Sequence, residues 1–152
     1  MVVDTEPHGG VRYRLLETVR EYGRERLLEA GEGDGVCRRH FRYYLALAEE
    51  SRAKLSGPEQ VRWLRRLEVE HDNLRGALSW CAKWEQDAEP GLELVVALGT
   101  FWDVRGHFSE GRDYLAAALE RAGDQAPADL RSRALYYQAV LAFRQGDLAE
   151  AR

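Results

Sequence analysis

The stretch that decides the fold is residues 92–123, LELVVALGTFWDVRGHFSEGRDYLAAALERAG. Its apolar residues recur every three or four positions on both sides of Arg105-Gly106-His107, a spacing that aligns side chains on one face of a helix. The residues on the first face are large, such as Leu98, and those on the second are small, such as Gly111. Because small residues facing large ones let two helix backbones approach closely, the stretch predicts a helical hairpin with a tight turn at Gly106.

The turn of this hairpin recurs 40 residues further along the chain. Residues 106–112, GHFSEGR, align with residues 146–152, GDLAEAR, with identical Gly, Glu and Arg. Seven positions before each turn glycine lies a small residue, Gly99 in one copy and Ala139 in the other. Periods of this length are typical of stacked helical-hairpin repeats. The sequence therefore predicts an all-α fold, a tetratricopeptide-like α-solenoid of antiparallel helical hairpins.

The segments before this stretch predict a short β-hairpin followed by more helices. Val11, Tyr13 and Leu15 alternate with Arg12 and Arg14 after a His8-Gly9-Gly10 turn signal, which is typical of paired strands. Helices are expected from about 18 to 30 and from 36 to 55, and a helical pattern then fills residues 58–84. That pattern fits either one long helix or two helices broken near His71, and we favour a break with Asp72 as the N-cap because about 26 residues is long for a globular helix.

Composition excludes several classes of protein. The 152 residues carry a net charge of −4, which gives no support to nucleic-acid binding. No apolar run approaches the roughly 18 residues that a bilayer span needs, and no secretory signal follows Met1. The two cysteines, Cys37 and Cys81, do not make a disulfide framework. We therefore expect a cytoplasmic protein that contacts neither a membrane nor nucleic acid directly.

Three blocks resemble one family, the bacterial STAND-class ATPase transcriptional regulators of the AfsR-like and LuxR-like kind. These blocks are residues 12–22 (RYRLLETVREY), 63–78 (WLRRLEVEHDNLRGAL) and 105–112 (RGHFSEGR). The resemblance implies that residues 1–30 are the tail of a winged-helix module, with its β-hairpin and helix. It implies that residues 36–152 begin the tetratricopeptide-like region, truncated at the C-terminus. The family's ATPase would lie upstream and its DNA-binding domain elsewhere.

No pattern of residues indicates a catalytic, cofactor or metal site. Cys37, His40, His71 and Cys81 include metal-ligand types, but the last two lie ten residues apart and form no motif. An acid–histidine cluster at residues 68–72 is not ordered into a triad. Neither Lys54 nor Lys83 follows a glycine, so no phosphate-binding loop is present. We expect packed core residues and solvated charges, no enzyme activity and no cofactor.

The predicted function is a non-catalytic sensor or scaffold region of a signalling ATPase that regulates transcription. Its partner would be a protein, a peptide or the ATPase domain of the same chain. Candidate surface residues are Asp103 and Arg105, on the first helix of a pair, and Trp84, off the apolar stripe. The alternatives are a structural module that self-associates as a homodimer, or the helical arm of another multidomain enzyme such as a kinase or cyclase.

Overall fold

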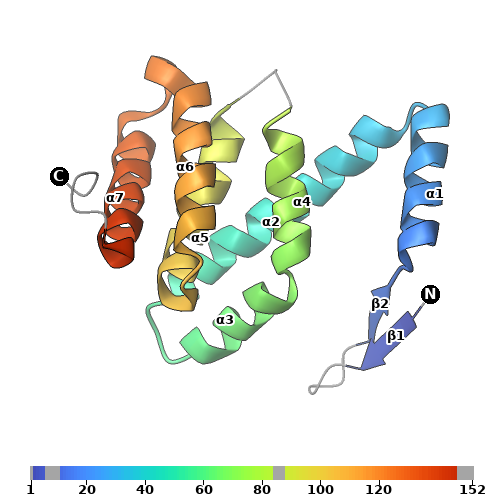
Figure 1. Cartoon of the computed structure of the whole chain (residues 1–152), viewed down its shortest axis with the longest axis horizontal. Helices are drawn as coiled ribbons and strands as arrows, with labels where there is room; N and C mark the ends of the chain where they lie inside the picture. The colour runs from blue at the N-terminus through green and yellow to red at the C-terminus, as the bar shows by residue number, and fades with distance from the viewer. Residues whose placement is uncertain (1, 6–10, 84–87, 147–152) are drawn as a thin grey trace. The chain divides into compact units, whose positions relative to one another are not determined.

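A computed structural model describes residues 2–5, 11–83 and 88–146 of the chain (Figure 1). It divides into two compact units, Met1–Arg38 and Arg39–Arg152. Seven α-helices and two strands lie within the described residues. None of these helices has both the length and the apolar character that a bilayer span would need.

The first unit contains both strands and the first helix. Strands β1 (Val2–Thr5) and β2 (Val11–Arg14) pair antiparallel, with Val3 opposite Tyr13. The predicted turn at His8-Gly9-Gly10 lies outside the described residues. Helix α1 (Glu17–Glu29) follows at once, and its first backbone bonds join the amides of Val19 and Arg20 to the Leu16 carbonyl.

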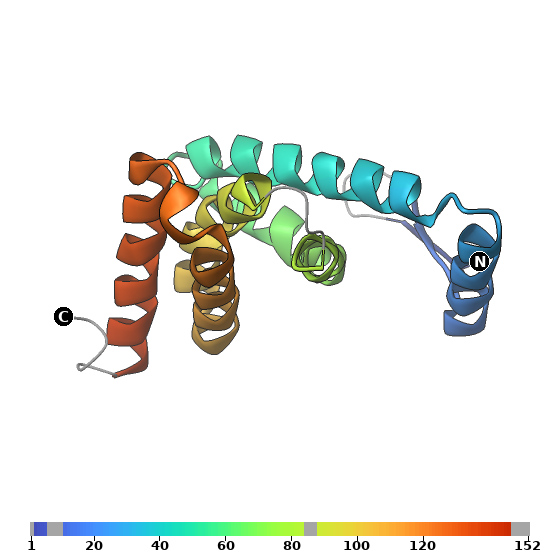
Figure 2. The ribbon, with the colours of Figure 1, turned by 90° about the horizontal axis from the view of Figure 1, so that it is seen from above.

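The second unit is helical. Its elements are α2 (Gly33–Lys54, which begins before the division), α3 (Gln60–Val69), α4 (His71–Cys81), α5 (Glu89–Arg105), α6 (Phe108–Ala122), a 3-10 turn (Gly123–Gln125) and α7 (Ala128–Gln145). Figures 1 and 2 show α6 beside both α5 and α7, and the three helices pack pairwise. The largest fully buried side chains, Trp102, Phe41 and Phe101, lie in this unit.

Helix α5 ends where the sequence predicts the tight turn. Gly106 takes the left-handed conformation, with φ of +78°, and Gly146 does the same after α7, with φ of +84°. Glycine adopts the left-handed conformation readily because glycine has no Cβ that would clash with the backbone. Both turns therefore sit at glycines 40 residues apart in the sequence.

The helical pattern of residues 58–84 is broken, as predicted, and the single-helix alternative is wrong. The break is at Glu70, between α3 and α4. The predicted cap is also wrong, since Asp72 lies in the first turn of α4 and Glu70 holds the N-cap position without a side-chain cap bond. The Glu70 carboxylate instead accepts hydrogen bonds from Tyr44 Oη at 2.8 Å and Asn73 Nδ2 at 2.6 Å. Tertiary contacts thus determine the shape of this corner.

Candidate functional site

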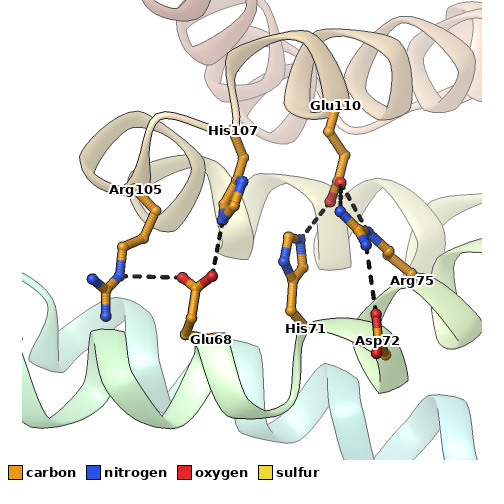
Figure 3. A network of polar contacts seen from close by, with 7 residues as sticks. All are labelled: Glu68, His71, Asp72, Arg75, Arg105, His107 and Glu110. Atoms are coloured by element: carbon orange, nitrogen blue, oxygen red, sulfur yellow. Dashed lines mark hydrogen bonds and ion pairs between the residues drawn. The ribbon is translucent and has the colours of Figure 1, made fainter.

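A network of charged and imidazole side chains lies where α3, α4 and the α5–α6 turn meet (Figure 3). Glu68 lies near the end of α3, and His71 begins α4. On the other side, Arg105 ends α5 and His107 precedes α6, whose first turn contains Glu110. The break at Glu70 and the left-handed turn at Gly106 therefore bring the α3–α4 junction and the α5–α6 turn together.

Glu110 is the centre of one half of this network. Its Oε1 lies 2.6 Å from His71 Nε2. Its Oε2 accepts hydrogen bonds from Arg75 Nε at 2.9 Å and Nη2 at 2.5 Å. His71 is buried, with 8% of its surface exposed, so the carboxylate satisfies a ring nitrogen that would otherwise lack a partner. Glu110 therefore joins α6 to α4 through two side chains.

The surroundings of Glu110 favour its ionised form. Burial acts to raise the pKa of this carboxyl, but hydrogen bonds and charge from Arg75 and His71 outweigh it, and the pKa falls below its ordinary value. The bond to Glu110 likewise raises the pKa of Arg75. Glu110 also lies in the first turn of α6, where the helix dipole favours a negative charge. The contact between α4 and α6 is therefore an ion pair at neutral pH.

Glu68 is the centre of the other half. Its Oε2 lies 3.3 Å from Arg105 Nε, and its Oε1 lies 3.4 Å from His107 Nε2. The His71 and His107 rings are 4.4 Å apart between centroids, and the edge of Phe101 packs against His71. His107 Nε2 is buried and has no hydrogen-bond partner among the described residues.

Two of the three surface residues predicted from the sequence, Asp103 and Arg105, lie within the described residues. Asp103 Oδ1 accepts a hydrogen bond from Arg144 Nε at 2.8 Å, so it links α5 to α7. Arg105 pairs with Glu68, so it links α5 to α3. Trp84 lies outside the described residues. The two described side chains thus make contacts within the fold.

The structure divides the acid–histidine cluster of residues 68–72. Glu70 turns toward Tyr44, while Glu68 and His71 meet His107. His71 and Cys81 lie at opposite ends of α4, about 15 Å apart at 1.5 Å per residue, so they cannot bind one ion.

The pKa of His40 is lowered, chiefly by burial, although the nearby Glu70 charge acts to raise it.

A second feature is a polar groove of about 200 Å³ between α2, α5 and α7. Its charged lining residues are Glu49, Arg52, Glu89, Glu93, Asp129 and Arg133. Four acidic and two basic side chains leave a net charge of −2 along this groove. The sequence did not predict it, because it combines helices that are far apart in the chain.

The chain is similar to a segment of known proteins. It is 40% identical over 120 residues to three mycobacterial proteins, one from Mycobacterium bovis and two from strains of Mycobacterium tuberculosis. Each is named a "putative HTH-type transcriptional regulator". The match covers 79% of this chain and 13% of each relative, so the chain spans about an eighth of their length. No protein-family model and no solved structure matches it.

Proposed function

We propose that this chain is a non-catalytic interaction region, a sensor or scaffold, within a cytoplasmic signalling ATPase that regulates transcription. The observation that carries the proposal is the acidic groove between α2, α5 and α7. The similarity to a segment of mycobacterial proteins named as HTH-type transcriptional regulators supports the regulatory context. The blocks at residues 12–22, 63–78 and 105–112 support the STAND-class assignment.

The helix pairs also support a tetratricopeptide-like arrangement. Helices α5 and α7 end at left-handed glycines 40 residues apart, and α6 packs against both of them. In this arrangement α5 and α7 are the first helices of successive pairs. Both line the groove, and we infer that this groove takes a peptide segment. Its negative charge selects a basic segment of a partner protein or of the same chain.

Binding of a basic peptide tests this function. A short labelled peptide of alternating lysine and alanine should bind saturably, with a Kd on the order of 10 µM, which is a weak contact. Fluorescence anisotropy at low salt would measure the Kd. A Glu49→Lys, Asp129→Lys variant should weaken binding about 10-fold, because rim charges set electrostatic complementarity. Both acidic residues are exposed.

The matched control is a Glu50→Lys, Glu120→Lys variant, which makes the same charge change at exposed acidic residues outside the groove. It should bind the peptide as tightly as the unmodified chain. A glutamate–alanine peptide and duplex DNA should not bind. Absence of saturable peptide binding, equal weakening in both variants, or tight DNA binding would each reject the groove as the interaction site.

One observation favours self-association as a second candidate function. Leu135, Tyr136 and Phe143 of α7 are 47%, 63% and 62% exposed, and clustered exposed apolar residues are typical of protein contacts. If copies of the chain pair through α7, sedimentation velocity should show a dimer that grows with concentration. A Tyr136→Glu, Phe143→Glu variant should then remain a monomer. A single monomeric species for the unmodified chain at all concentrations would exclude this candidate.

A further inference from the structure

Three side chains of metal-ligand type converge at the corner between α3, α4 and the α5–α6 turn. Glu68, His71 and His107 each offer one ligand atom, and these atoms all lie within 4.8 Å of one another. Figure 3 shows the His107 ring directed at Glu68, with His71 standing beside both. The three residues come from different elements, so only the tertiary fold assembles them.

The spacing of two of these atoms suits a tetrahedral cation. Zinc binds imidazole nitrogen and carboxylate oxygen at about 2.0–2.2 Å, which places neighbouring ligand atoms roughly 3.3–3.6 Å apart. Glu68 Oε1 and His107 Nε2 lie 3.4 Å apart. The nitrogen is buried and has no hydrogen-bond partner among the described residues, and such atoms in a native protein call for an explanation. A cation between the two atoms supplies one.

The third ligand is already oriented. His71 Nε2 lies 2.6 Å from Glu110 Oε1, and a carboxylate on one ring nitrogen holds the proton there and leaves the other nitrogen as a lone-pair donor. In Figure 3 that other nitrogen, Nδ1, lies on the side of the ring toward Glu68 and His107. Carboxylate–histidine–metal arrangements of this form are common around zinc.

The net charge of the side chains around Glu68, His71 and His107 is negative, which favours binding of a cation. The side chains drawn in Figure 3 comprise three carboxylates, two guanidinium groups and two imidazoles, a net charge of −1 with neutral histidines. Arg75 is held by Glu110 and Asp72. Arg105 contacts Glu68 through Oε2, and Figure 3 shows it on the side away from His71. Oε1 therefore remains directed at the histidines.

We propose that Glu68, His71 and His107 form a zinc site, with Glu110 as the positioning residue of His71. Two imidazoles exclude Ca²⁺ and Mg²⁺ as preferred ions, because those cations take oxygen ligands. Three protein ligands leave the fourth position to water. Bound zinc joins the end of α3, the start of α4 and the α5–α6 turn. The stability of the contact between these elements therefore increases with zinc concentration.

Zinc binding and thermal unfolding test the proposal on the whole chain at neutral pH. Competition against a chromophoric chelator should give one zinc per chain with a Kd on the order of 1 µM or tighter. Zinc should raise the unfolding temperature, and EDTA should reverse the rise. Cobalt in place of zinc should show the visible absorption of a tetrahedral site.

Variants assign the ligands. Loss of a ligand in His107→Gln or Glu68→Gln should weaken zinc binding roughly 100-fold or more, and the positioning variant Glu110→Gln should weaken it about 10- to 100-fold. His40→Gln is the matched control, because His40 lies outside the trio, and it should leave the Kd unchanged. Circular dichroism in EDTA establishes that each variant is folded.

Two outcomes would overturn the site. One is the absence of stoichiometric zinc binding to the folded, unmodified chain. The other is zinc binding that His107→Gln and Glu68→Gln leave unchanged, which would place the ion on other residues. If His107→Gln loses thermal stability in EDTA but no zinc affinity, the histidine is a packing residue and the proposal fails.

Discussion

Replacing Gly99 with alanine is expected to lower the free energy of unfolding by about 2 kcal/mol, because the added methyl group overpacks the contact between α5 and α7. A Cβ at this position would lie 2.3 Å from Cγ of Tyr137 and 2.4–2.5 Å from its Cδ atoms. These atoms lie at the base of the ring, so a small rotation cannot remove the clash. The ring must move, and the 2.9 Å bond between Tyr137 Oη and Thr100 Oγ1 is lost. Urea denaturation followed by circular dichroism measures the change.

Gly76→Ala is the matched control for this substitution. Gly76 also lies inside a helix of the second unit, but a Cβ there meets only His40 Cε1 at 3.7 Å, an ordinary contact. This variant should gain about 0.5–1 kcal/mol, because alanine is a better helix former than glycine. The two substitutions should therefore have opposite signs.

A second variant separates the clash from a general weakness of α5. Adding Tyr137→Ala to Gly99→Ala removes the ring that the methyl group meets. The double variant should be less destabilised than the sum of the two single variants, since the residues share one contact. Additive losses, or a Gly99→Ala variant as stable as the unmodified chain, would contradict the close approach.

The spacing of apolar residues was enough to predict two helices of the second unit, α5 and α6, and the turn between them. The three- and four-residue spacing in residues 92–123 located α5 and α6, and the glycine at 106 located the turn between them. The break near His71 was predicted from length alone. Its cap was not, because Glu70 is held by Tyr44, which lies 26 residues earlier in the chain. Helix periodicity contains no information about such a partner.

The polar network around Glu68 and Glu110 could not be predicted from the sequence for the same reason. Glu68 and His71 were noticed as an acid–histidine cluster, but their partners His107 and Glu110 lie 39 residues further on. Spacing within a helix predicts which face a residue occupies and not which residue faces it. Arg105 was assigned to a binding surface from its helix position, and that role stays a prediction; its contact with Glu68 was not predicted, because Glu68 lies 37 residues earlier in the chain.

Replacing Glu110 with alanine is expected to lower the free energy of unfolding by about 3 kcal/mol in EDTA, because two partners lose a charged hydrogen-bond acceptor at once. Arg75 can partly rehydrate, since 46% of its side chain is exposed, whereas His71 cannot, since only 10% is. Most of the loss therefore comes from the buried imidazole. Chemical denaturation at pH 7 measures it, and working in EDTA separates this contact from any effect of zinc.

The control is Glu120→Ala, which removes an exposed carboxylate from the same helix. It should change stability by no more than about 0.5 kcal/mol, as is usual for surface substitutions. A loss at Glu120 equal to that at Glu110 would mean that α6 needs its negative charge in general, for solubility or helix formation, and not the specific contact with α4.

The stabilisation of the fold by the Glu110 carboxylate should also decrease as the pH falls. The pKa of Glu110 is lowered in the folded chain relative to its ordinary value of 4.5, so the unfolded chain binds a proton at this site more readily than the folded chain. The stabilisation by its charge is then complete above about pH 4.5 and is lost as the pH falls through the folded pKa. The difference in unfolding free energy between the unmodified chain and Glu110→Gln should be constant near neutrality and shrink in acid. A difference that stays constant down to pH 3 would mean that the negative charge of Glu110 adds nothing to stability, and the ion pair with Arg75 would not be what joins α6 to α4.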